Sequence, residues 1–236
     1  MKKTFAALSI LGVIASSLEA ATVAKWTFEA SVPSSTGSSI SGLAAEEGSG
    51  SASAFHTSAL TIYSNPAGNG SAESFSADKW AIEDYWQFQT STVGFTNISI
   101  SYDQTSSSTG PRDFALSYSV NGSSFTAIGG TYAVLQNGLA PNASWTIGTS
   151  VPAYGFSVSL FGIGAAEEAP SLFFRIKDMS AVTPSGGAVA ATGTSRIDNF
   201  VVSGVSSVTL VPEPATWALF GAGVIGLGFV VRRKNK

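Results

Sequence analysis

Apolar and polar residues alternate in several short segments of this chain. In residues 24–29 (AKWTFE) every second side chain is apolar, which is the period of a strand with one buried face. The same alternation recurs at residues 95–102, 114–120, 171–176 and 196–202. Asn121-Gly122 follows one of these segments, with Phe125 beyond it, and is a strong signal for a β-hairpin. Short strands without a convincing amphipathic helix predict an all-β fold, an antiparallel β-sandwich.

Two segments between these strands are rich in serine, glycine and alanine, at residues 31–58 and 184–194. They carry few bulky apolar side chains, so they offer little surface for a hydrophobic core. We therefore predict that both segments are loops.

The first twenty residues have the three parts of a signal peptide. Lys2 and Lys3 are followed by an eleven-residue apolar run at 5–15 and then by small residues. The alternative is an N-terminal membrane anchor, but eleven residues are too few to span about 30 Å of hydrocarbon as a helix. The sequence predicts a signal peptide at 1–20 with cleavage after Ala20.

The other end of the chain has a more specific pattern. Pro212, Glu213 and Pro214 precede 17 uncharged, mostly apolar residues at 215–231, and basic residues 232–236 close the chain. This length is at the short end of the range for a transmembrane helix, and basic residues favour the cytoplasmic side. We predict a single helix at 215–231 with a cytoplasmic end at 232–236, within a tail at 211–236. The exported domain between the two ends is then 21–210.

Composition narrows the classes of function. The chain has no cysteine, which excludes disulfides, thiolate metal sites and cysteine nucleophiles. Charged residues make up only 11%, so serine, threonine, asparagine and glycine must supply most of the polar surface. Residues 22–211 contain six bases and thirteen acids, a net charge of −7. An acidic body has no electrostatic reason to bind nucleic acid.

The tail resembles a PEP-CTERM sorting signal, because Pro212-Glu213-Pro214, the glycine-rich apolar segment and the basic end with Arg232 and Arg233 occur in order. Such tails occur on exported proteins of Gram-negative bacteria that make exopolysaccharide. The resemblance implies that a membrane-embedded exosortase recognises the Pro-Glu-Pro motif and removes the tail. Together with signal peptidase at the other end, this processing would place the body first at the membrane and then on the cell surface or outside the cell.

Part of the body also resembles a known module. Residues 84–88, 94–104, 110–114, 118–122 and 196–199 are similar to a module that recurs in PEP-CTERM proteins, which is itself similar to jelly-roll carbohydrate-binding modules. The resemblance implies that the terminal strands pair and that a structural calcium bridges acids at positions such as Glu29 and Asp198. Calcium requires six to eight oxygen ligands. The alternative is that these two acids cap strands or pair with Arg196 or Lys25.

Signals for catalysis are weak. Nucleophilic hydrolysis needs a base beside a serine, but His56 is the only histidine, it lies in a serine-rich segment, and no G-x-S-x-G sequence exists. We expect His56 to be a solvated side chain. The adjacent acids Glu46-Glu47, Glu83-Asp84 and Glu167-Glu168 do not face each other across a cleft, because neighbours on a strand point to opposite faces. We predict that the chain is not an enzyme and needs no cofactor.

Sugar binding is a further option. Aromatic rings can stack on the apolar faces of sugar rings, and Trp80, Tyr85, Trp86 and Trp145 are the candidates. Trp86 shares one strand face with Phe88, whereas Tyr85 lies on the other, so only part of this group can be exposed. The alternative is that these rings belong to the core.

These observations predict an exported, non-enzymatic protein of the cell envelope or extracellular matrix, with a structural or adhesive role in exopolysaccharide. The alternative is a protein that recognises polysaccharide in the manner of a carbohydrate-binding module. A polysaccharide-degrading enzyme ranks third.

Overall fold

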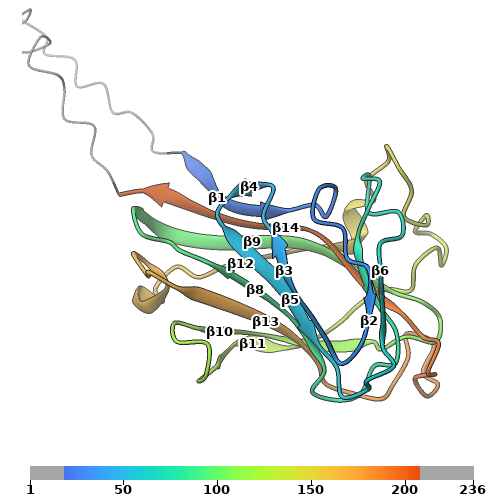
Figure 1. The fold of residues 1–236 in the computed structure, drawn as a ribbon. Helices are drawn as coiled ribbons and strands as arrows, with labels where there is room; N and C mark the ends of the chain where they lie inside the picture. Colours follow the sequence, from blue (N-terminus) through green and yellow to red (C-terminus); the bar gives the residue numbers. More distant parts are fainter. Residues whose placement is uncertain (1–18, 208–236) are drawn as a thin grey trace, which may run out of the picture. The chain divides into compact units, whose positions relative to one another are not determined.

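The computed structural model describes residues 19–207, which fold into two antiparallel sheets packed face to face (Figure 1). In the eight-stranded sheet the order is β12-β9-β14-β7-β6-β2, with β1 beside β14 and β4 beside β1. Its strands are β1 (Ala20–Trp26), β2 (Ser35–Thr36), β4 (Glu47–Gly48), β6 (Ile62–Ser64), β7 (Phe75–Ala77), β9 (Phe95–Ser106), β12 (Gly155–Ser159) and β14 (Ser195–Ser206).

The six-stranded sheet has the order β11-β10-β13-β8-β5-β3. Its strands are β3 (Ser39–Ala44), β5 (Gly50–Phe55), β8 (Tyr85–Thr90), β10 (Asp113–Ser119), β11 (Thr126–Ala133) and β13 (Leu172–Asp178). Two single-turn 3-10 helices, η1 (Pro152–Tyr154) and η2 (Gly164–Ala166), lie in the connections. The predicted antiparallel β-sandwich is confirmed.

All five segments with alternating residues form strands, and the Asn121-Gly122 turn lies between the paired strands β10 and β11, as predicted. The first strand ends earlier than expected, at Trp26, because Phe28 has a positive φ of 61° and turns the chain away from the sheet. The first and last strands pair antiparallel, from Ala20 opposite Val205 to Trp26 opposite Phe200. Cleavage after Ala20 would therefore remove only the first residue of β1.

The prediction that residues 31–58 form a loop is wrong, because β3 and β5 of the six-stranded sheet lie within them. In β5 the inward residues are Ala52 and Ala54, and both are buried. They pair in register with Phe88 and Trp86 of β8, so small side chains stand beside two large rings. The alanines thus reflect close packing against aromatic neighbours. Residues 184–194 lie outside the strands, as predicted.

Aromatic rings from both sheets fill the space between them. Phe88 of β8 stacks on Phe200 of β14 with ring centroids 3.7 Å apart and ring planes 1° apart. The Trp26 ring packs edge-on against Phe88 at 5.3 Å. All three side chains are completely buried, and burial of a ring of this size contributes about 2–3 kcal/mol to stability. These contacts join the two sheets across the core.

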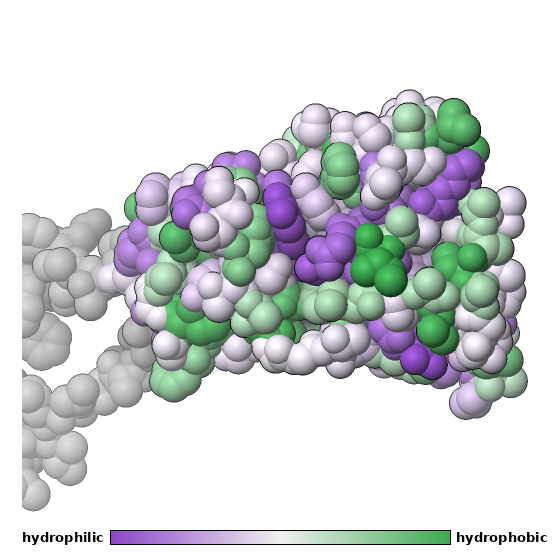
Figure 2. All heavy atoms as spheres, turned by 90° about the horizontal axis from the view of Figure 1, so that it is seen from below, coloured by the Kyte–Doolittle hydropathy of each residue, from purple (hydrophilic) through white to green (hydrophobic). Residues whose placement is uncertain are grey.

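The exterior agrees with the low content of charge. On the face that Figure 2 presents, most residues have intermediate hydropathy, and the strongly hydrophobic ones are separated from one another. Within residues 19–207, no helix has the length and apolar character needed to cross a membrane. The predicted helix at 215–231 and residues 1–18 of the predicted signal peptide lie outside the described residues.

Candidate functional site

The outer face of the six-stranded sheet carries a regular array of side chains. Alternation buries one set of residues in the core and leaves the other set on this face. Strand register aligns the outward residues in three rows: Phe55, Tyr85, Lys177 and Ala115; Ser53, Gln87, Arg175 and Ser117; Ser51, Gln89 and Phe173. Aromatic, amide, hydroxyl and cationic groups therefore share one continuous surface.

Two rings cover one guanidinium group at the centre of this surface, and a third ring stacks on one of them. Phe55 and Tyr85 stack with ring centroids 5.7 Å apart and an angle of 28° between the ring planes. The guanidinium carbon of Arg175 lies 4.2 Å from the ring centroid of Tyr85 and 3.8 Å from that of Phe125. Both distances are within the range of a cation–π contact. We call Phe55, Tyr85, Phe125 and Arg175 the aromatic–arginine cluster.

Local structure fixes the positions of the cluster residues. The Nε of Arg175 donates a hydrogen bond of 2.8 Å to the side-chain oxygen of Gln87, its partner on β8. Phe125 ends the β10–β11 loop, which the Asn121 side chain orders by accepting the backbone N–H groups of Ser123 and Ser124. Because register and a defined turn hold them, these rings need little rearrangement to meet a ligand.

Exposure separates the cluster from the core rings. Phe55 is 44% exposed and Tyr85 is half-buried, whereas Trp86, adjacent to Tyr85, is completely buried. A rigid, partly exposed ring offers apolar area while its neighbours offer hydrogen bonds. The cluster can therefore bind a flat, partly apolar ligand without a deep pocket.

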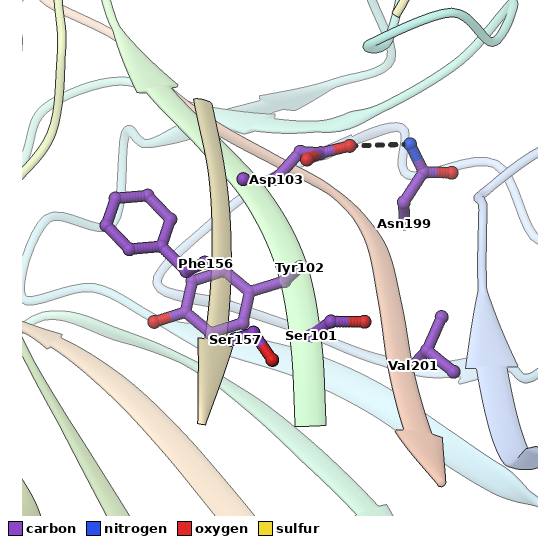
Figure 3. Close-up of a pocket in the computed structure, with 8 residues that line it drawn as sticks. Ser101, Tyr102, Asp103, Phe156, Ser157, Asn199 and Val201 are labelled. Carbon is purple, nitrogen blue, oxygen red and sulfur yellow. Dashed lines mark hydrogen bonds between the residues drawn. The ribbon is translucent and has the colours of Figure 1, made fainter. Parts of the chain in front are cut away.

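A second candidate lies on the outer face of the eight-stranded sheet. It is an open pocket of about 330 Å³. The pocket is lined by Ser101, Tyr102, Asp103, Gly155, Phe156, Ser157, Asn199 and Val201, from β9, β12 and β14 (Figure 3). The Nδ2 of Asn199 donates to Asp103 at 2.9 Å, and burial raises the pKa of the Asp103 carboxyl. The half-buried Phe156 of this pocket also stacks on Tyr102, with ring centroids 5.3 Å apart, but no cation–π contact of the described residues involves these rings.

The two acids predicted to hold calcium contact the same loop, between β6 and β7. Oε1 of Glu29 accepts the backbone N–H groups of Ala72 and Glu73, at 2.7 and 2.9 Å. Oδ2 of Asp198 accepts the N–H of Asn69 at 2.9 Å and the hydroxyl of Ser71 at 2.5 Å.

Hydrogen-bond donors thus already point at these carboxylate oxygens, where a cation would need free lone pairs. Among residues 19–207 no group of three or more histidine, cysteine or acidic side chains is placed to hold a metal ion. Both acids anchor this loop through these hydrogen bonds, and a calcium site at Glu29 and Asp198 stays a prediction. The alternative, a pairing of these acids with Lys25, does not occur in the described residues, where Lys25 binds Glu47 at 3.0 Å.

Three of the four rings predicted to stack on sugars are buried. Trp80, Trp86 and Trp145 are 7%, 0% and 4% exposed, respectively, so they cannot offer a face to a ligand. Trp86 stacks against Phe114 within the core, as the core alternative requires. Only Tyr85 points outward. Sequence reasoning missed Phe55, Phe125 and Arg175. The alternation at residues 171–176 could have placed Arg175 on an outer face, whereas Phe55 fell in a segment predicted as a loop.

The expectation that His56 is solvated is wrong. Its side chain is completely buried, with Nδ1 3.4 Å from Oδ2 of Asp84 and its ring 4.3 Å from the Trp80 ring. Burial, the largest cause, lowers the pKa of His56 and so favours the neutral imidazole, while the nearby Asp84 opposes this shift. A ring without access to solvent cannot act on a substrate, so this histidine belongs to the core.

The residues predicted to direct sorting, Pro212, Glu213, Pro214, Arg232 and Arg233, lie outside the described residues. A comparison with protein families matches residues 210–234 to the PEP-CTERM protein-sorting motif. The chain therefore carries this sorting motif, which implies an exported protein that is sorted by an exosortase. No curated protein matches the chain.

Among solved structures, the chain is similar to the K3 cleaved adhesin domain of Lys-gingipain from Porphyromonas gingivalis. The TM-score is 0.41 and the identity 14%, over 77% of this chain and 98% of that one. It is also similar to the CBM22-2 xylan-binding domain of Paenibacillus barcinonensis Xyn10C, with a TM-score of 0.42 and 10% identity, over 77% and 98% of the two chains.

Proposed function

We propose that this protein is an exported, non-enzymatic component of the extracellular matrix that adheres to exopolysaccharide through the aromatic–arginine cluster. The sorting motif at residues 210–234 supports export and sorting. The observation that supports the adhesive role is the outward stack of Phe55 on Tyr85 beside Arg175, on a sheet face that also carries several serines and glutamines.

The physical reason is that a sugar ring has both apolar C–H faces and a rim of hydroxyl groups. Partly exposed rings remove the apolar face from water, while Gln87, Gln89 and Ser53 are placed to exchange hydrogen bonds with the hydroxyls. An array on a flat sheet can bind repeated units along a polymer, and several weak contacts then combine into stable adhesion.

A glycan array with the body, residues 21–210, tests this proposal. The strand pairings of residues 20–206 close within that segment, so the body can be produced without the two ends. Binding to polysaccharide that Tyr85→Ala abolishes supports the proposal. Phe161→Ala is the matched control, because Phe161 is 78% exposed and lies outside the cluster. Release of reducing sugar from any bound glycan would instead favour a degradative enzyme.

Sorting has its own test, the intact mass of the mature protein recovered from membranes and from culture medium. We expect loss of both ends, near Ala20 and near Pro212-Glu213-Pro214, by signal peptidase and exosortase. A protein that keeps residues 215–236 and occurs only in membranes would be a tail-anchored envelope protein, and the release step would then be wrong.

A further inference from the structure

Resting on the proposed function, we propose that the aromatic–arginine cluster selects acidic polysaccharide, with Arg175 binding the carboxylate groups of uronic acid units. The stacked rings account for adhesion to sugar in general. Arg175 adds a charge requirement that a neutral glycan does not meet.

The distribution of charge singles out Arg175. Residues 19–207 contain six bases, and four of them form ion pairs with carboxylates: Lys25 with Glu47, Lys79 with Asp78, Arg112 with Asp113, and Lys177 with Glu83. Arg175 and Arg196 have no acidic partner within these residues. Arg196 lies on the other sheet. On the six-stranded sheet, then, Arg175 is the cation that no acid of the described chain neutralises, in a body that has more than twice as many acids as bases.

The geometry leaves the binding side of this guanidinium open. Its Nε is bonded to Gln87, and its carbon lies over the Tyr85 and Phe125 rings, so the group is held flat and in one place. Its two terminal amino groups make no hydrogen bond within residues 19–207. A guanidinium of this kind binds a carboxylate through two parallel hydrogen bonds, and prior ordering reduces the entropy lost on binding.

The surroundings favour a close anionic contact despite the negative body. None of the residues in the three rows is acidic. The carboxylate of Glu83, outside the rows, is paired with Lys177 at 2.7 Å, so it does not oppose an acidic ligand. Acids farther away are screened at physiological salt, where the Debye length is about 8 Å. A sugar ring packed on Phe55, which is 44% exposed, would bring a carboxylate of the polymer close to Arg175, since Tyr85 contacts both side chains.

The test compares one polymer in two charge states, polygalacturonate and its fully methyl-esterified form, by affinity gel electrophoresis of the body. We expect the wild type to bind the acid at least tenfold more tightly than the ester. Arg175→Gln should remove this preference while weak binding to the ester remains, and Arg175→Lys should restore only part of it. Lys25→Gln, which removes a cation from the other sheet, should leave the preference unchanged.

Equal binding of the two polymers by the wild type, or a preference that survives in Arg175→Gln, overturns this inference and leaves general adhesion intact. Binding that is confined to neutral glycans on the array would likewise overturn this inference and leave general adhesion intact. Absence of binding to every glycan overturns the proposed function itself. If melting curves show that Arg175→Gln does not fold, Arg175→Lys decides: an undiminished preference for the acid would contradict the bidentate contact.

Discussion

The outer faces of the two sheets cover the same core but present different side chains. On the eight-stranded sheet the outward residues of β9, β12 and β14 include a group of serines: Ser99, Ser101, Ser157, Ser159 and Ser203. On the six-stranded sheet they include Phe55, Tyr85 and Arg175. Both faces follow the same alternation, so the pattern that builds the sandwich leaves the outward positions free to differ. Of these two outer faces, only that of the six-stranded sheet has a pair of stacked rings in contact with an arginine.

The first prediction separates inward from outward rings on one strand. Trp86→Ala should lower the free energy of unfolding by about 3–5 kcal/mol, because it empties a large volume in the core. Tyr85→Ala, at the adjacent position, should cost no more than about 1 kcal/mol, since its ring is partly solvated. Chemical denaturation of the two variants measures both values. Similar losses would mean that Tyr85 serves stability and would weaken its assignment to binding.

A buried carboxyl in each sheet makes stability depend on pH. Burial raises the pKa of Asp178 in β13 and of Asp198 in β14 to about 7, whereas an unfolded aspartate titrates near 4. Between these pH values the folded state binds more protons than the unfolded state, so stability should fall as the pH rises from about 4 to about 7. The lowered pKa of His56 opposes this trend below about pH 6.5.

Asp178→Asn should remove part of this loss of stability. The difference in free energy of unfolding between the variant and the wild type should shift in favour of the variant by about 2 kcal/mol from pH 5 to pH 8. Asp198→Asn is the contrasting variant. Its amide would replace an oxygen that accepts the N–H of Asn69, so it should destabilise the fold at both pH values. Thermal melts across this range measure the difference. A pH profile of Asp178→Asn that matches the wild type would show that Asp178 titrates normally.

A substitution in the β10–β11 turn, which precedes Phe125, should have a smaller effect on stability. Gly122 has a φ of +71°, and a Cβ added there would lie 3.1 Å from the Phe173 ring. Gly122→Ala should therefore cost about 1 kcal/mol and displace the loop. We expect weaker binding to polysaccharide as well, measured by affinity electrophoresis. Gly148→Ala has a comparable φ of +80° and open space around it, so its strain should leave binding unchanged.

The smallest expected effect concerns calcium. Because N–H and O–H donors point at the oxygens of Glu29 and Asp198, the melting temperature should be the same in millimolar calcium and in chelator. A calcium-dependent rise, measured by differential scanning fluorimetry and lost in Asp198→Asn, would contradict the hydrogen-bonded anchor described above.

The sequence allowed prediction of the features that depend on neighbouring residues. Alternation predicted the strands and the opposite orientations of Tyr85 and Trp86, and Asn121-Gly122 predicted the hairpin. Alternation did not predict β5. Its inward alanines make room for large rings on β8, and those rings are more than thirty residues away in the sequence.

The candidate site was only partly predictable for the same reason. Tyr85 was named, but its contacts with Phe55 and Arg175 depend on the pairing of three strands, and a single sequence does not specify that register. His56 shows the converse error. Its serine-rich sequence suggested solvent, yet the fold packs it against Trp80 and Asp84. Local chemistry alone did not reveal burial.

The central claim is that the six-stranded face, and not the eight-stranded face, binds polysaccharide. Affinity electrophoresis in a gel that contains the best glycan from the array tests it with one variant on each face. We predict that Tyr85→Ala loses the retardation shown by the wild type, while Asp103→Asn, in the pocket of the other sheet, keeps it. Loss of retardation in Asp103→Asn with full retention in Tyr85→Ala would contradict the account and move the site to the opposite face.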